Sequence, residues 1–265
     1  MVDTNDGLAR LAIIVAVALQ AIGKVAYGTW LEDFPAPLFV LISFTLTAIF
    51  FLSTSRKGIG AVAWGTMLFL NVATAVTFLS LFIALKLIQP AIVGAVEISI
   101  GPIAAVAIGF FIHRIIPSSR SLTVCCVVLA GCLILASSAF FGSGFQATKL
   151  DVALGLLASS TAGIGAVFIT IASKSLLCQG WKFGAILAHR FYIIVPVSLA
   201  LLWIMDPSNV EWSIQLGFAV VAISGVSVLA PLYLLQVGIS RCDPYTVMVT
   251  MAALPVLTFA VEGFS

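Results

Sequence analysis

Nine apolar runs, each long enough to cross a bilayer, fill this sequence and leave only short polar connections between them. About 20 apolar residues span the hydrocarbon core of a membrane as an α-helix. In lipid only helices and closed barrels satisfy their backbone polar groups, and the alternation typical of barrel strands is absent. The chain is 62% hydrophobic and 8% charged, whereas about a quarter of the residues of soluble domains are charged. The sequence therefore predicts an all-α polytopic membrane protein.

The runs predict helices over residues 8–27, 37–53, 59–85, 91–112, 122–141, 152–176, 183–203, 212–239 and 245–263. The connections are too short to hide a soluble domain. Met1–Arg10 carries two aspartates and one cation, whereas a cleaved signal peptide begins with a basic segment. We therefore expect the first run to be retained as a membrane span.

Cations are distributed unequally between the two sides that alternating helices define. Eight fall on the side of the N-terminus: Arg10, Arg56, Lys57, Arg114, Arg120, Lys174, Lys182 and Arg241. The other side has two, Lys86 and Lys149, together with the acidic Glu32, Asp33, Asp151, Asp206 and Glu211. By the positive-inside rule the N-terminus is cytoplasmic. We expect a multi-pass protein of the cell membrane, in a bacterium the inner membrane.

Two stretches predict an internal repeat. They are LFIALKLIQPAIVGAVEISIGPIAAVAIGFF from Leu81 and LLQVGISRCDPYTVMVTMAALPVLTFAVEGF from Leu234. Each has a helix end, a polar turn with a proline (Pro90, Pro244) and an apolar helix with a second proline (Pro102, Pro255) that we expect to kink it. Five helices per copy is an odd number, so the second copy is inverted, as in many secondary transporters. We expect repeats over 1–141 and 152–265 around an external linker, 142–151; chance matching of prolines is the alternative.

The stretch IGPIAAVAIGFFIHRIIPSSRSLTVCCVVLAGCLILASS from Ile100, with AALPVLTFAVEGFS from Ala252, resembles the EamA-like permeases of the drug/metabolite transporter superfamily. The sequence departs from that pattern at Ile112-His113-Arg114, where the family usually has a Gly-Glu pair. The resemblance implies ten helices with both ends cytoplasmic, so we expect the chain to be a fragment lacking the tenth, a natural nine-helix variant being the alternative. It also implies a cavity lined by the runs 8–27, 59–85, 91–112, 152–176, 212–239 and 245–263.

Two ionisable side chains are expected deep in the first half. Glu97 lies about seven residues into the run 91–112, about 10 Å below its outer end. Lys24 lies near the same surface in the first run. Because both are at comparable depth, an ion pair is geometrically allowed. Glu97 is then either a cation or proton site lining an outward cavity or a structural bridge, and Lys24 either joins it or extends its ammonium to the interface.

Arg190 is the corresponding candidate in the second half, with His189 beside it. The resemblance implies a basic residue at its place, and its guanidinium suits a carboxylate or phosphate; a buried structural arginine is the alternative. Mid-span polar residues complete the cavity candidates: Gln20, Asn71, Ser99 and Gln236. Gln20 and Asn71 are the stronger candidates, because an amide in lipid needs hydrogen-bond partners at both its oxygen and its nitrogen.

No catalytic constellation is visible in the sequence. It has two histidines, no metal-ligand spacing among its five cysteines and no phosphate-binding glycine loop, so we expect no enzyme activity, metal or cofactor. We expect a secondary transporter that exports a small metabolite, such as an amino acid, a related organic solute or a drug, by alternating access. The alternatives are a membrane-embedded lipid enzyme and an accessory subunit. The expected partners are this solute and the lipid bilayer, not nucleic acid; a homodimer stays open.

Overall fold

The structure, a computed structural model, describes residues 4–263 except 32, 56–57, 62, 115, 142–147, 206–209, 243–246, 248–249 and 252. Over these residues it consists of helices and connections, without a strand. The helices are α1 (Thr4–Trp30), α2 (Ala36–Ser55), α3 (Trp64–Leu87), α4 (Pro90–His113), α5 (Ser119–Phe141), α6 (Lys149–Cys178), α7 (Phe183–His189), α8 (Ile194–Met205), α9 (Ile214–Ser224), the π-helix η1 (Gly225–Leu229), α10 (Ala230–Arg241) and α12 (Leu254–Glu262).

Seven spans of the described chain are long and apolar enough to cross a membrane. They are Gly7–Trp30, Ala36–Ser55, Trp64–Leu87, Pro90–Phe111, Lys149–Cys178, Phe183–Ile204 and Ile214–Arg241. The other two apolar runs of the sequence correspond to α5 and to 245–263, which the structure describes in part. Large apolar side chains on the outer surface, such as Trp203, Ile214 and Phe218, are more than 75% exposed, as lipid-facing residues are. The predicted all-α polytopic class is confirmed.

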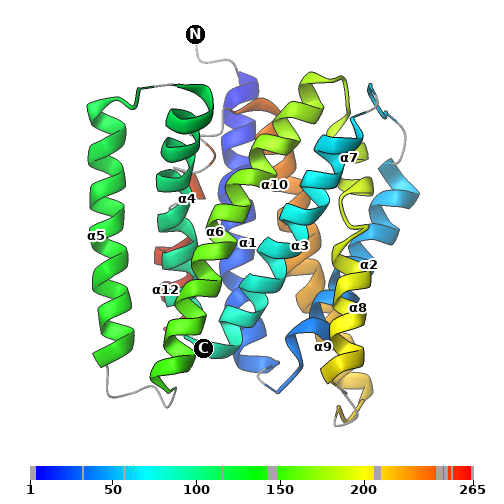
Figure 1. The fold of residues 1–265 in the computed structure, drawn as a ribbon. Coiled ribbons are helices and arrows are strands. Elements are labelled where there is room, and N and C mark those ends of the chain that lie inside the picture. The colour runs from blue at the N-terminus through cyan, green and yellow to red at the C-terminus, as the bar shows by residue number, and fades with distance from the viewer. Residues whose placement is uncertain are drawn as a thin grey trace.

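The helices form a bundle around α1, with α5 at one edge (Figure 1). α3 packs along α6 and α10 along α1; α4 packs on α6, and α12 on α1. α5 packs on α4 and α6. Inside the bundle, the ring of Tyr27 lies 4.5 Å from that of Phe39 and 5.1 Å from that of Phe82, centroid to centroid. Close helix contact depends on small residues: a Cβ atom at Gly163 of α6 would collide with the backbone carbonyl of Glu97 in α4.

The run 183–203 is not the single helix that the sequence predicts. It is divided into α7 and α8, and the break begins at Arg190. Pro196 lies in the first turn of α8, where it lacks the N–H that an unbroken helix would donate to the carbonyl of Tyr192. Arg190 therefore belongs to an irregular backbone segment at membrane depth. Such segments are tolerated where protein or a water-filled cavity surrounds them.

The run 212–239 is also irregular. Five residues between α9 and α10 form the π-helix η1. Pro231 follows in the first turn of α10; in a continuous α-helix its ring would clash with the carbonyl of Ser227. The wider π turn removes this clash and is a feature that recurs at functional sites.

The two prolines that are predicted to kink their helices, Pro102 and Pro255, lie at different places in the described helices. Pro102 lies inside α4, as predicted, and is buried. Pro255 lies in the first turn of α12, where a missing N–H costs no intrahelical hydrogen bond. Thr250 and Met251, shortly before this turn, are also helical, and residue 252 lies outside the described residues, so the kink at Pro255 stays a prediction. Its partner in the predicted turn, Pro244, lies outside the described residues.

Several predicted helix boundaries shift by a few residues. α3 begins at Trp64, not at residue 59. Most of the predicted external linker, 142–151, lies outside the described residues, but its last three residues already belong to α6. A capping box fixes this start: the Asp151 backbone N–H donates to Thr148 Oγ1 at 3.2 Å, and the Thr148 N–H donates to Asp151 Oδ2 at 3.1 Å.

Candidate functional site

A narrow cavity of about 50 Å³ lies between α1, α3, α4, α6, the α7–α8 break and the η1–α10 segment. Its apolar wall includes Phe78, Leu81, Phe82, Ile169 and Leu235. Its polar lining consists of Gln20, Lys24, Thr77, Glu97, Thr170, Arg190, Ser227 and Gln236. Helices from both ends of the chain therefore contribute charged and polar groups to one buried space.

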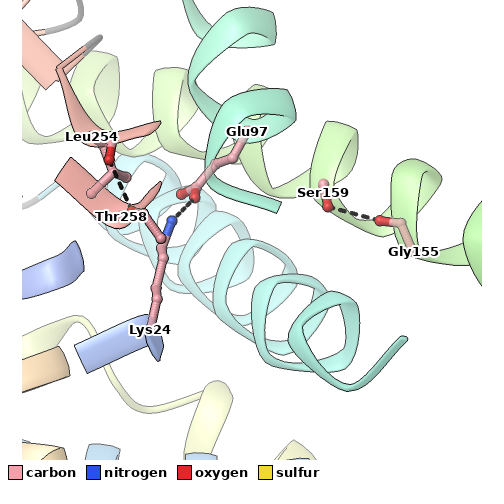
Figure 2. Close-up of polar contacts among 6 residues, drawn as sticks. All are labelled: Lys24, Glu97, Gly155, Ser159, Leu254 and Thr258. Carbon is pink, nitrogen blue, oxygen red and sulfur yellow. Dashed lines mark hydrogen bonds and ion pairs between the residues drawn. The ribbon is translucent and has the colours of Figure 1, made fainter. Parts of the chain in front are cut away.

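Lys24 of α1 and Glu97 of α4 form an ion pair in this cavity, with Lys24 Nζ donating to Glu97 Oε2 (Figure 2). Both residues are buried, at 4% and 6% exposed. The pair that the depth argument allowed is confirmed. Because each charge is removed from water, loss of one partner would leave the other uncompensated, at a cost of about 3–5 kcal/mol.

The ion pair lies where α1, α4 and α12 approach one another. Thr258 of α12 is close to it and donates its own hydroxyl to the Leu254 carbonyl at 2.9 Å (Figure 2). A Cβ atom at Gly94 would lie 3.6 Å from Thr258 Oγ1 and 3.9 Å from Lys24 Nζ. The lysine ammonium is thus enclosed by three helices, which fixes its position opposite the carboxylate.

Arg190 is the second buried cation, at 2% exposed. Its Nε donates to Thr74 Oγ1 at 3.3 Å, and its guanidinium carbon lies 5.7 Å from the centre of the Phe191 ring. Arg190 Nη2 is buried and has no hydrogen-bond partner among the described residues. Lys24–Glu97 is the one ion pair within that part of the chain, so no described carboxylate neutralises Arg190.

Asn71 explains how the helix break at Arg190 is held. Its Nδ2 donates to the carbonyls of Met67 at 3.0 Å and His189 at 2.9 Å, and its Oδ1 accepts the N–H of Tyr192 at 2.8 Å. One side chain of α3 thus satisfies backbone groups on both sides of the break. Asn71 is not part of the cavity lining, so its prediction as a substrate-binding residue is replaced by a bracing role.

Gln236 of α10 is 1% exposed, and neither Oε1 nor Nε2 of its amide has a hydrogen-bond partner among the described residues. A buried amide without partners is costly. Because Gln236 lines the cavity, a bound solute or water is the natural partner for both atoms.

Five of the predicted cavity residues are brought together: Gln20, Lys24, Glu97, Arg190 and Gln236. Ser99 is buried in α4 but does not line the cavity, because it is about 200° around the helix from Glu97. Pro102 is also absent from the cavity lining.

Three hydroxyls of the lining were not among the predicted site residues. Thr77 Oγ1 donates to the Ala73 carbonyl at 2.6 Å, Thr170 Oγ1 to Ala166 at 2.9 Å and Ser227 Oγ to Ile223 at 2.7 Å. Mid-span hydroxyls commonly bond the preceding turn in this way. The residue type therefore gives no signal that separates these three from hydroxyls elsewhere in the bundle.

Comparison with known proteins identifies a shared fold and no family. Neither a protein-family model nor a curated protein matches this sequence. A solved structure, described only as the crystal structure of a protein, matches with a TM-score of 0.70 and 19% identity over 97% of this chain and 88% of its own. The chain therefore shares its helical architecture with a protein of similar length, and at this identity the likeness is one of fold alone.

Proposed function

We propose that this protein is a secondary transporter that moves a small organic solute across the cytoplasmic membrane by alternating access, in the outward direction. The observation that carries the proposal is the cavity itself, with Lys24, Glu97 and Arg190 buried inside a bundle of apolar helices. Ionisable groups at membrane depth are costly and mark substrate or ion pathways.

The irregular helices support the same function. Secondary transporters hold substrate near the midplane between two repeats, next to discontinuous helices. Here the α7–α8 break places Arg190 in the cavity lining, and η1 places Ser227 there. Irregular backbone thus coincides with the polar lining at two places that are far apart in sequence.

The packing supports an inverted repeat, with copies over 1–141 and 152–265. α3 packs on the first helix of the second half, α6, as α10 packs on the first helix of the first half, α1. α4 and α12 repeat this relation, since α4 packs on α6 and α12 on α1. Two copies related by a pseudo-two-fold axis would give this reciprocal pattern, which agrees with the resemblance to EamA-like permeases.

The charge distribution supports a cytoplasmic N-terminus. Successive spans alternate in direction, with α7–α8 and α9–α10 each forming one span (Figure 1). The C-terminal end of α4 at Arg114 and that of α10 at Arg241 therefore share the side of the start of α1. The opposite side has Asp151 in the first turn of α6 and Glu211 before α9. This is the polarity that the positive-inside rule associates with the cytoplasm.

Counterflow in proteoliposomes tests the transport function. Vesicles containing the purified full chain are loaded with one unlabelled solute and diluted into the same solute in labelled form, over a panel of alanine, threonine, lactate, succinate and choline. We expect protein-dependent, saturable uptake of at least one solute and none in protein-free vesicles. Folded, monodisperse protein that exchanges no organic solute of the panel would contradict a transporter of this class and favour an enzyme or accessory subunit.

A further inference from the structure

The cavity lining has one more positive than negative side chain. Lys24 and Arg190 are cations and Glu97 is the one described acid in the lining, so the lining has a net charge of +1. Since Lys24 and Glu97 neutralise one another, the excess positive charge belongs to Arg190. A buried charge without a counter-charge is unfavourable, and a ligand that supplies the negative charge removes this cost.

The unpartnered atoms specify what this ligand presents. Arg190 offers the N–H groups of Nη2, because only its Nε is engaged by Thr74. Gln236 offers Nε2 as a donor and Oε1 as an acceptor. Both residues are more than nine-tenths buried and line the same cavity. These unpartnered atoms therefore present donors from two elements, the α7–α8 break and α10, together with one acceptor.

We propose that Arg190 and Gln236 form the subsite for the carboxylate of the transported solute, which is a small monocarboxylate. This inference deepens the proposed function. That the solute is transported rests on the proposed function, whereas its binding at this subsite does not. A planar guanidinium matches the two oxygens of a carboxylate, and one uncompensated positive charge matches a monoanion. The Gln236 Oε1 acceptor suits a hydroxyl or amino group elsewhere on the same solute.

The rest of the lining limits the body of the solute. The apolar part of the cavity wall includes Phe78, Leu81 and Phe82, which favours a short hydrocarbon segment on the same solute. The space of about 50 Å³ is far below the 300–1,000 Å³ typical of drug-sized pockets. A small solute is therefore favoured over a large one in this conformation of the protein.

The backbone around Arg190 is held in place before any ligand binds. Asn71 fixes the carbonyl of His189 and the amide of Tyr192, the residues on either side of the Arg190–Phe191 segment. An arginine on a braced segment loses less conformational entropy on binding than one on a mobile loop. This preorganisation favours a binding role over a purely structural one.

The test measures binding separately from transport. Thermal unfolding of the detergent-purified full chain is followed at constant ionic strength against propionate and lactate, with propionamide and lactamide as neutral analogues of the same shape. We expect a saturable rise in melting temperature with at least one carboxylate and none with its amide. Chloride and phosphate, tested in the same way, distinguish a carboxylate site from a general anion site.

Variants locate the effect. Arg190→Gln is expected to raise the apparent dissociation constant about 10- to 100-fold, and Gln236→Leu about fivefold, from the loss of a charge-assisted and a neutral hydrogen bond. Arg10→Gln, which removes an exposed arginine of α1, is expected to leave it unchanged. Arg190→Lys keeps the positive charge but loses the planar guanidinium with its two parallel donors. This variant replaces Arg190→Gln in the test if Arg190→Gln does not fold, and we expect it to bind the carboxylate about tenfold more weakly than the wild type.

Three results would overturn the subsite: no carboxylate stabilises the wild-type protein, amides or inorganic anions stabilise it equally well, or both Arg190 variants bind carboxylate as the wild type does. Carboxylate binding that depends on Arg190, without any exchange in vesicles, would instead overturn the transport function and leave the subsite standing.

Discussion

Replacing Glu97 by glutamine tests whether the buried ion pair is structural, functional or both. The substitution keeps the shape of the side chain and a hydrogen-bonding group but removes the negative charge. Lys24, which is 4% exposed and enclosed by α1, α4 and α12, is then left as a second uncompensated cation. The cavity lining changes from a net charge of +1 to +2.

The expected loss of stability follows from this burial. Removing one partner of a buried pair costs about 3–5 kcal/mol, whereas replacing both by neutral groups is often neutral or stabilising. For a chain of this length, 1 kcal/mol corresponds to about 2 °C in melting temperature. We therefore expect Glu97→Gln to unfold about 6–10 °C below the wild type, and Glu97→Gln combined with Lys24→Met to return to the wild-type temperature or above.

The assay is a double-mutant cycle read by thermal unfolding, beside counterflow of the solute found with the wild type. Glu211→Gln, at an exposed glutamate outside the cavity, is the matched control and should change neither quantity. A melting temperature of Glu97→Gln within 2 °C of the wild type would refute the reasoning from burial. Normal counterflow in the double variant would show that the pair only stabilises the bundle, whereas restored stability without counterflow would assign it to transport.

Three further outcomes are expected. Asn71→Leu leaves the backbone groups at the α7–α8 break unsatisfied and should cost about 2–4 kcal/mol, measured by thermal unfolding; unchanged stability would mean that the break needs no brace. Gly163→Ala places a Cβ atom against a carbonyl of α4 and should destabilise, whereas Gly217→Ala, with open space around it, should stabilise by about 0.5–1 kcal/mol; equal effects would contradict the packing. In a cysteine-free background, an impermeant thiol reagent applied outside should label Glu211→Cys and not Ser119→Cys, and the reverse pattern would invert the topology.

The sequence predicts the features that the lipid environment itself requires. Spans are readable because apolar length alone sets them. The Lys24–Glu97 pair is readable because an ionisable group at membrane depth needs a partner, and two opposite charges at similar depth leave few choices. Gln20, Arg190 and Gln236 were found by the same reasoning, since amides and cations inside a span require an explanation.

Features set by tertiary contact were not readable. The brace at the α7–α8 break joins Asn71 to Tyr192 across 121 positions of the chain, and no local pattern links the two. Asn71 was therefore taken as a cavity residue on its polarity alone. Pro255 illustrates a related limit, because a proline in an apolar run indicates either a kink or a helix start, and packing decides between them.

The π-helix has a consequence for how this chain tolerates insertions and deletions. A π turn accommodates one residue more than an α turn, so the flanking helices keep the faces they would have without that residue. Deleting a single residue between Gly225 and Leu229 should convert the turn to an α turn that the Pro231 ring kinks, and leave Gln236 directed at the cavity. Straightening the turn at full length would instead rotate α10 by about 100° and exchange Gln236 for an apolar neighbour. Natural variants that are one residue shorter here would thus keep the cavity polar, whereas those shortened within α10 would lose it.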